Sequence, residues 1–495
     1  MARDDHELVL TNGRFVTPTG VFEGWLLAAQ GVIQAMGKGP PPTAETEVEA
    51  NGRFVLPGLV DPEAHLGVTQ SFAEDVAAES KAAVASGVTT WGLQQVVVNT
   101  MPTYLREPKK SDHVPWSGQV PHFIETIEKH SWVDAYLTAV LMTDEQAEEI
   151  PQLADEHGVT SYKMYMHLRP GPEKLSRRWY AGHRTHGFDD GTVYRAMEQI
   201  ASLGYPGILS VHCENWEIAW MLEDRLRAQG RTDMRAWNEK SPAFVEAGHV
   251  RTYSYYARIS GCPLHIQHVT TPETVTEIER ARSEGTVVVG QTGPHYLILD
   301  HDQWKINVPL RSPETIEWLW SAVAERRIDS IGSDHIGQTK TREEMDKQNV
   351  WETLSGFPSR VEVMLPALLS AGVSEGRLTI EDVVRITAEN PARIWGLYPT
   401  KGCIAVGSDA DLVVVDLDRQ MTIQRDNVQS AAPWSLYEGM SFRGWPSTII
   451  LGGVVACHWP DSAGTPTYAE HPTGGYVRRT PTRRPYRSDW RAPRV

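Results

Sequence analysis

The chain is long enough for more than one domain, and its composition is that of an ordinary globular protein. It has 495 residues, of which 41% are hydrophobic and 22% are charged, so it can bury a large core. Its net charge of -16 at pH 7 argues against a nucleic-acid partner, because such binding depends on clustered Lys and Arg. The 4 cysteines include no CxxC pair, which argues against a zinc ribbon or a redox dithiol and fits a reducing compartment. No stretch has the length of a membrane span, so we expect a cytoplasmic protein without a membrane partner.

The pattern of short strands and longer helices changes twice along the chain. Residues 7–55 predict short strands, with an Asn-Gly hairpin signal in "ELVLTNGRFVTPTG". From about residue 56 to 390, short β-rich runs alternate with helical segments such as "EDVAAESKAAVASG", which predicts a parallel sheet. At this length and repeat number, a closed barrel is favoured over an open doubly wound sheet. After this region the β pattern returns, as in "STIILGGVVAC".

We therefore predict an α/β protein with three parts. Residues 56–394 form a (β/α)8 TIM-like barrel, and residues 1–55 and 395–460 together form a small β-sandwich domain. Residues 461–495 are an extended C-terminal tail, rich in Pro, Arg and Thr. The basic end of this tail could bridge subunits by pairing with the acidic body, and a disordered terminus is the alternative.

Polar side chains follow the predicted strands of the barrel. In "LPGLVDPEAHLG" an apolar run leads into Asp61, Glu63 and His65, which alternate along one strand. Other predicted strand ends carry Lys163, His212, His268, Asp334 and His335. Because the carboxyl ends of barrel strands meet at one face, we expect these side chains to converge. Imidazole nitrogens and carboxylate oxygens suit zinc and similar divalent ions.

Each of these residues alone has a simpler explanation. A single histidine at a strand end is more often structural, a single lysine is usually exposed, and Asp334 could cap a helix. So many strand ends with metal-capable groups are hard to explain by packing, and we favour a metal site. An ammonium at Lys163 would repel cations. A carboxylated Lys163 would be anionic and could bridge two metals, and burial favours the neutral amine that reacts with carbon dioxide.

Together these motifs resemble the cyclic amidohydrolases of the amidohydrolase superfamily, which include dihydropyrimidinases, hydantoinases and allantoinases. The resemblance covers about residues 7–455 and rests on "LPGLVDPEAHLG", "YKMYM", "VHCEN", "QTGPHYLILD", "KINVPLRS", "IDSIGSDH" and "AENPARIWGLYPTKGCIAVGSDADLVVVD". It implies two divalent metal ions, first of all zinc, in a (β/α)8 barrel. It also implies a homotetramer.

The resemblance assigns a role to each of these residues. Glu63, His65 and Asp334 would hold the inner metal, and carboxylated Lys163 would bridge the pair. His212 and His268 would hold the outer metal. Asp334 would also be the general acid and base while hydroxide attacks the carbonyl of the ring. The residues expected to contact the substrate are Tyr165, His167, Asn307 and His335.

Two positions, Glu63 and Leu168, depart from the family pattern, and a third, Gly67, argues against a dihydroorotase. The family has histidine where Glu63 stands; a carboxylate tilts the preference toward harder ions such as manganese and adds a negative charge. It could also swing away and leave one metal, or mark a lost ligand. Leu168 stands where dihydropyrimidinases have a tyrosine that donates to the oxyanion. Gly67 stands where dihydroorotases have the arginine that binds a carboxylate. A small neutral ring other than dihydrouracil is therefore expected.

These observations leave three functions open. The first is a metal-dependent hydrolase that opens a cyclic amide, imide or ureide ring. The second is a scaffold without metal or activity, supported only by Glu63 and Leu168. The third is a single-metal hydrolase or deaminase for a non-cyclic C–N bond, against which Lys163 in the bridging position counts. Metal occupancy distinguishes the first function from the second.

Overall fold

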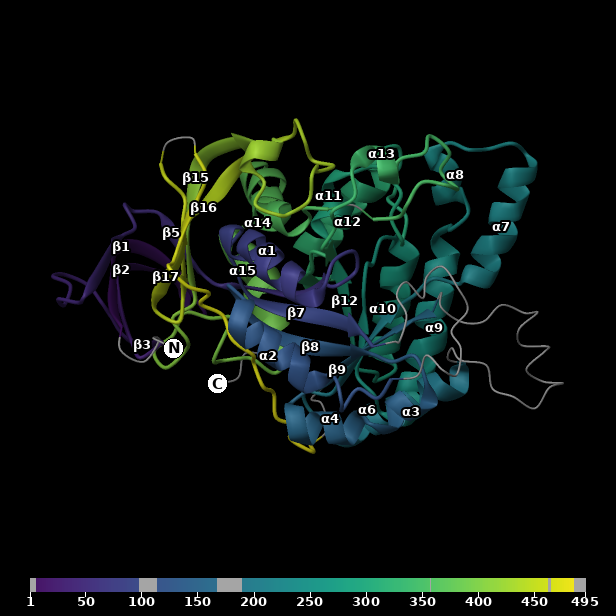
Figure 1. The fold of residues 1–495 in the computed structure, drawn as a ribbon, viewed down its shortest axis with the longest axis horizontal. Coiled ribbons are helices and arrows are strands. Elements are labelled where there is room, and N and C mark those ends of the chain that lie inside the picture. Colours follow the sequence, from purple (N-terminus) through teal and green to yellow (C-terminus); the bar gives the residue numbers. More distant parts are fainter. Residues whose placement is uncertain (1–5, 98–113, 167–188, 357, 462–463, 485–495) are drawn as a thin grey trace.

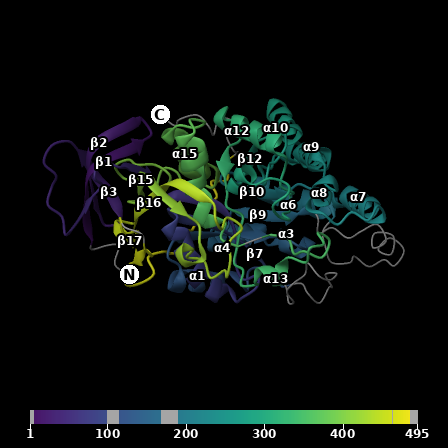
Figure 2. The ribbon, with the colours of Figure 1, turned by 90° about the horizontal axis from the view of Figure 1, so that it is seen from above.

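A computed structural model describes residues 6–97, 114–166, 189–356, 358–461 and 464–484, and arranges them around two β-sheets (Figure 1). One sheet is parallel and lies within a layer of helices. The other is a mixed sheet at one end of the long axis, as Figure 2 also shows. No helix among the described residues is long and apolar enough to cross a bilayer.

The parallel sheet closes into a barrel. Its consecutive strands pair in chain order: β6 (Leu59–His65), β7 (Val88–Val96), β8 (Asp134–Val140), β9 (Ser161–Tyr165), β10 (Ile208–His212), β11 (Leu264–Ile266) and β12 (Val288–Thr292). The last barrel segment is split. Its first part, β13 (Ser330–Ile331), pairs with β12, and its second part, β14 (His335–Ile336), pairs with β6. The pairing of β14 with β6 closes the ring, and the predicted (β/α)8 barrel is confirmed.

Helices cover the outside of the barrel, and several begin at a residue that caps them. Ser71 forms a capping box with Glu74 at the start of α1, and Thr271 caps α10, which has Pro272 in its first turn. The first α-helices are α1 (Phe72–Ala85), α2 (Val120–His130), α3 (Asp144–Glu148), α4 (Ile150–His157), α6 (Asp190–Leu203), α7 (Trp216–Ala228), α8 (Met234–Glu239) and α9 (Ala243–Ser260). The later ones are α10 (Pro272–Ser283), α11 (Pro294–Ile298), α12 (Pro313–Ala324), α13 (Arg342–Met345), α14 (Met364–Ala367), α15 (Ile380–Val384) and α16 (Asn390–Ile394). Short 3-10 turns are η4 (Val361–Val363) and η7 (Arg425–Asn427), and π-helical turns are η5 (Leu368–Ser374) and η6 (Arg385–Glu389).

The second sheet joins both ends of the chain, as predicted. Its strands are β1 (Glu7–Thr17), β2 (Gly20–Ala29), β3 (Val32–Gly37), β4 (Thr46–Glu49), β5 (Phe54–Pro57), β15 (Leu412–Thr422), β16 (Ser441–Leu451), β17 (Val454–His458) and β18 (Thr467–Tyr468). β5 pairs with β15 in antiparallel fashion, with Val55 opposite Val414. Because β5 runs directly into β6, this sheet anchors the start of the strand that carries Glu63 and His65.

The described part of the C-terminal tail runs along its own barrel. The amide of Ala135, in β8, donates to the carbonyl of Gly475 at 2.9 Å, and the amide of Thr482 donates to the carbonyl of Tyr205 at 2.7 Å. Between these contacts the side chain of Arg479 is buried, donates to the carbonyl of Leu137 at 2.8 Å and lies 4.2 Å from the centre of the Tyr136 ring. This part of the tail therefore binds the amino ends of the strands within one chain. Its predicted role between subunits, and the homotetramer, stay predictions.

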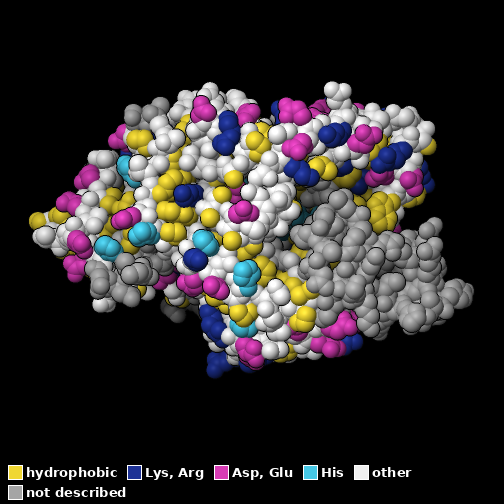
Figure 3. Space-filling view, in the orientation of Figure 1, with side chains coloured by type: hydrophobic (Ala, Val, Ile, Leu, Met, Phe, Trp, Pro, Cys, Tyr) yellow, Lys and Arg dark blue, Asp and Glu magenta, His cyan; other side chains and the backbone are white. Residues whose placement is uncertain are grey.

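The visible surface agrees with the moderate charge of the chain. Figure 3 shows acidic and basic side chains mixed over one face, and no large region of the described residues there is basic alone. The largest buried side chains include Trp91, Trp116, Trp304 and Trp395, so many of the 17 tryptophans serve the core.

Candidate metal centre

The barrel brings the predicted ligands to its carboxyl end. Glu63 and His65 lie two residues apart on β6 and so face the same side. Lys163 lies in the middle of β9, and His212 is the last residue of β10. Two further ligand candidates, His268 and Asp334, lie just outside regular strands.

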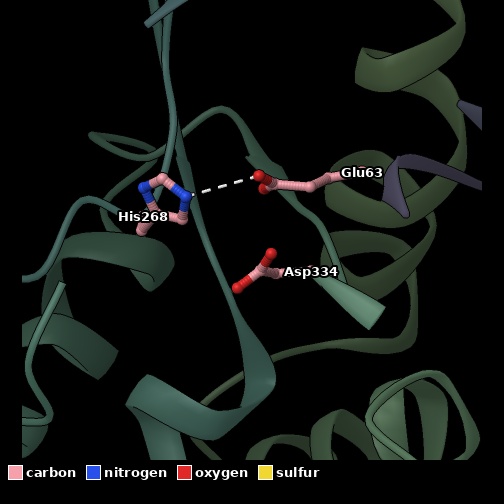
Figure 4. Close-up of side chains that lie close together, drawn as sticks. All are labelled: Glu63, His268 and Asp334. Carbon is pink, nitrogen blue, oxygen red and sulfur yellow. Dashed lines mark ion pairs between the residues drawn. The ribbon is translucent and has the colours of Figure 1, made fainter. Parts of the chain in front are cut away.

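The backbones of His268 and Asp334 are unusual. His268 follows β11 with a φ of 46°, and Asp334 lies between β13 and β14 with a φ of 51°. Residues other than glycine rarely adopt this left-handed region, and those that do are often found at functional sites. Each backbone thereby leaves its strand and turns the side chain toward the barrel axis, where Figure 4 shows both beside Glu63.

Three of the candidates lie around a carboxylate oxygen of the fourth, Glu63. Glu63 Oε1 lies 3.3 Å from His268 Nε2, 3.8 Å from His65 Nε2 and 4.0 Å from Lys163 Nζ. Asp334 Oδ1 lies 3.2 Å from His65 Nε2. Ligand atoms of Glu63, His268 and Asp334 all lie within 4.8 Å of one another. The structure therefore places Glu63 in the cluster rather than turned away from it.

The cluster contains buried polar atoms whose hydrogen bonding is incomplete. Glu63 Oε1 and Lys163 Nζ are buried, and neither has a hydrogen-bond partner among the described residues. Buried polar atoms without a partner destabilise the folded protein unless a ligand or ion binds to them. The carboxylate oxygen could coordinate a divalent cation, and a carboxyl group on Nζ would turn the lysine into a metal ligand. The donor set therefore fits the metal centre that the residues suggest.

Burial tunes the protonation of the nitrogen groups toward the forms that such a centre needs. Burial lowers the pKa of Lys163 to about 8 and that of His212 to about 4. A neutral amine is the form that takes up carbon dioxide, and a neutral imidazole is the form that binds metal. Burial alone would raise the pKa of Glu63, but His268, His65 and Lys163 outweigh it and hold the pKa well below its usual value.

His212 lies at the edge of the cluster. Its ring packs edge-on against His268, with centroids 4.6 Å apart, while its Nε2 lies 3.2 Å from Glu214 Oε2. Glu214 also accepts from Trp216 Nε1 at 2.8 Å and from Ser241 Oγ at 2.6 Å. Glu214 thus fixes the orientation of His212 beside His268.

Asp334 uses its two oxygens differently. Oδ1 faces His65, and Oδ2 accepts a hydrogen bond from the Arg360 guanidinium. Burial acts to raise the pKa of Asp334, but Arg360 and His65 together outweigh burial and hold the pKa below its usual range. Arg360 comes from the loop before η4 and not from the end of a strand, so the strand-end pattern in the sequence did not indicate it.

Gln291 is a second residue that the sequence did not indicate. Its side-chain amide, near the end of β12, donates to Glu63 Oε2 and so directs Oε1 at the cluster. Gly332 makes room for this contact, since a Cβ there would lie 2.3 Å from Gln291 Nε2. Asp61 lies outside the cluster and instead accepts from Trp91 Nε1 at 2.8 Å and from the amide of Ser333 at 2.9 Å. Burial raises the pKa of Asp61 to about 6.

The residues predicted to contact the substrate do not all lie in the cluster. The Tyr165 hydroxyl lies 3.3 Å from His65 Nδ1, and its ring centre lies 4.6 Å from Lys163 Nζ, so Tyr165 belongs to the cluster. His335 is buried with its Nε2 2.9 Å from Glu79 Oε2 on α1, away from the cluster, which favours a structural role. Asn307 lies in the loop before α12 and has a buried Oδ1 without a hydrogen-bond partner among the described residues. His167 and Leu168 lie outside the described residues.

Comparison with known proteins agrees with this geometry. Residues 54–456 match the amidohydrolase family. The chain is 29% identical to an L-hydantoinase of Paenarthrobacter aurescens, over 91% of this chain and 94% of the relative. It is 31% identical to an allantoinase of Rubrobacter xylanophilus, over 86% and 88% of the two chains. Its fold superposes on an L-hydantoinase (dihydropyrimidinase) structure from Arthrobacter aurescens with a TM-score of 0.81 and 26% identity, covering 96% of this chain and 100% of the other. The chain belongs to the amidohydrolase family.

Proposed function

We propose that this protein is a metal-dependent hydrolase that opens the ring of a small, neutral cyclic amide, imide or ureide. The observation that carries the proposal is the buried Glu63 Oε1, which has no hydrogen bond among the described residues and lies within 4.0 Å of His65, His268 and Lys163. Relatives named hydantoinase and allantoinase support cyclic amides as the substrate class.

The proposed centre holds two divalent ions, zinc first and manganese as an alternative that the Glu63 oxygen favours. Glu63, His65 and Asp334 would hold one ion. His212 and His268 would hold the other, and carboxylated Lys163 would lie between them. When bound, the ions polarise the carbonyl and lower the pKa of the attacking water.

Asp334 moves the proton in the proposed reaction. Its Oδ1 is directed at the cluster while Oδ2 accepts from Arg360, so Oδ1 is the atom placed to take the proton from the attacking water. The same oxygen then returns the proton to the ring nitrogen as the C–N bond breaks. Tyr165 holds His65 in orientation through the contact between its hydroxyl and Nδ1.

The exposure of the cluster indicates the side from which the ring enters. The side chains of Glu63 and Lys163 are 1% and 0% exposed and form the floor. Those of His65 and Asp334 are 12% and 10% exposed, so the substrate approaches along these two.

Two arginines near the cluster, among the residues that the structure describes, support a neutral ring. Arg360 is paired with Asp334, and Arg311 with Glu246 at 3.3 Å and with the carbonyl of Ser241 at 2.7 Å. Both guanidinium groups therefore already have protein partners, and a carboxylate on the substrate would have to displace one of them.

A substrate panel tests the proposal. The purified protein is loaded with zinc or manganese in bicarbonate and offered hydantoin, 5-substituted hydantoins, dihydropyrimidines and allantoin, and ring opening is followed by the loss of ultraviolet absorbance or by product chromatography. We expect turnover of at least one ring, a rate at least about 10²-fold lower in Asp334→Asn, and none by the chelated protein. Failure on every ring by a protein that retains its metals would contradict the proposed substrate class.

A further inference from the structure

A buried arginine lies directly against the proposed metal centre. Arg360 is 1% exposed, and its guanidinium donates to Oδ2 of Asp334, a proposed metal ligand. Gly356 leaves room for the guanidinium, since a Cβ at that position would lie 3.2 Å from Arg360 Nη2. A fixed positive charge so close to a cation site repels the cation, so its position needs an explanation.

The negative charge of Glu63 offers an explanation for the position of Arg360. Glu63 and Asp334 are buried carboxylates, and Lys163 would become a third anion once carboxylated. A histidine in place of Glu63 would leave this set with one negative charge fewer. Arg360 adds one positive charge to the same set, so a site with Glu63 and Arg360 has the same net charge as a site with a neutral histidine and no arginine.

We propose that Arg360 is a positioning residue whose charge offsets that of Glu63, so that the centre binds its metals without excess negative charge. This inference rests on the metal centre of the proposed function and adds a role for a residue outside the ligand set. Arg360 is too deeply buried to meet a substrate, and its contact with Asp334 is the route through which its charge acts.

A purely orienting role for Arg360 predicts the opposite sign. If Arg360 served only to hold Asp334 in place, its loss would loosen a ligand and weaken metal binding. If Arg360 acts through its charge, its loss removes a repulsion and leaves Asp334 Oδ2 without its counter-ion, so metal binding becomes tighter. The sign of the change in metal affinity therefore separates the two roles.

The experiment measures the dissociation constant of Zn²⁺ from apoprotein by chelator competition in bicarbonate. We expect Arg360→Met to lower this constant by about tenfold or more and Arg360→Lys, which keeps the charge, to leave it within about threefold. Glu63→Gln should raise the constant, and the double variant Arg360→Met with Glu63→Gln should return toward the wild-type value. Arg360→Gln, which is neutral but can still donate to Asp334, should tighten binding too and decides the question if Arg360→Met does not fold.

Arg282 offers a matched control at the other end of the strands. Its guanidinium pairs with the buried Asp329, just before β13, as Arg360 pairs with Asp334 just after it. Arg282→Met should lower the melting temperature and leave the zinc constant unchanged.

Two other outcomes are distinct. Weaker or unchanged zinc binding by Arg360→Met and Arg360→Gln, in a wild type that binds zinc, overturns the offset role alone. A wild type that binds neither zinc nor manganese overturns the proposed function and this inference with it.

Discussion

Among the described residues, two groups of side chains have the spacing of a metal site, and they differ in the cations that contact their carboxylates. At the junction of barrel and small domain, Asp134, Asp409 and Asp411 surround Lys401, whose Nζ lies 2.7, 2.9 and 2.6 Å from their oxygens. In the cluster at the barrel mouth, Glu63 Oε1 has no hydrogen-bond partner among the described residues. In the first group Lys401 contacts all three carboxylates, whereas in the second Arg360 pairs with Asp334 and Glu63 Oε1 is left for the proposed metal.

The two buried lysines show the same contrast. Burial acts to lower the pKa of Lys401, but Asp134, Asp411 and Asp409 outweigh it and raise the pKa, so this lysine stays a cation. Lys163 has Glu63 only at 4.0 Å, and burial lowers its pKa to about 8. The same side chain is therefore a structural counter-ion at Lys401 and, in the proposed centre, a reactive amine at Lys163.

The largest expected effect separates the two groups by activity. Asp334→Asn should reduce turnover by about 10²-fold to 10⁴-fold, because it removes the proposed proton acceptor. Asp409→Asn, in the junction group, should keep turnover within about threefold. Rates of ring opening on the best substrate of the panel check both. An unchanged rate in Asp334→Asn would remove its assigned role.

The next effect concerns stability. Lys401→Met should lower the free energy of unfolding by about 3–5 kcal/mol, because three buried or half-buried carboxylates lose their common partner. Urea denaturation measures it, with the exposed Lys38→Met as the control. Recovery of the lost stability on adding zinc would mean that the junction group can also bind metal, and would contradict the difference between the two groups.

Metal removal should destabilise the protein only through the loss of metal from the cluster at the barrel mouth, and not through the junction group. Chelation of the loaded wild type should cost about 3 kcal/mol if the free metal had been near 100 times its dissociation constant. Asp409→Asn should lose the same amount, and Asp334→Asn clearly less, because it already binds metal weakly. Denaturant titrations with and without chelator measure the difference. Equal losses in all three proteins would place the metal elsewhere.

The smallest effect is a pH dependence of the rate at which Lys163 becomes carboxylated. Because the pKa of Lys163 is lowered to about 8, the neutral amine is the minor form below that pH and falls about tenfold for each unit. At constant dissolved carbon dioxide, carboxylation of the apoprotein should therefore slow about tenfold between pH 7 and pH 6. Carbon-13 NMR of the carbamate, with Lys163→Arg as the control, follows it. A rate that does not change with pH would show that the amine is not the limiting species.

Much of this arrangement could be predicted from sequence because parallel strands must end on one face. That rule places Glu63, His65, Lys163 and Asp334 together. The rule does not decide the position of His335, which follows Asp334 directly. Its Nε2 lies 2.9 Å from Glu79 Oε2, and its contact with the substrate stays a prediction.

The remaining features depend on tertiary contacts without a sequence pattern. Arg360 reaches Asp334 from a loop, and Gln291 reaches Glu63 across the barrel, at positions that no spacing rule connects. The tail has no apolar period, so only the hydrogen bonds of residues such as Gly475 and Thr482 to the barrel backbone reveal where it lies.

Metal content per chain is the measurement that tests the central claim most directly. The protein is purified without added metal, and its zinc and manganese are counted by plasma mass spectrometry against protein concentration. We predict close to two equivalents per chain, with Glu63 acting as a ligand. One equivalent or none, not restored by zinc or manganese with bicarbonate, would contradict the binuclear centre and the ring-opening mechanism built on it.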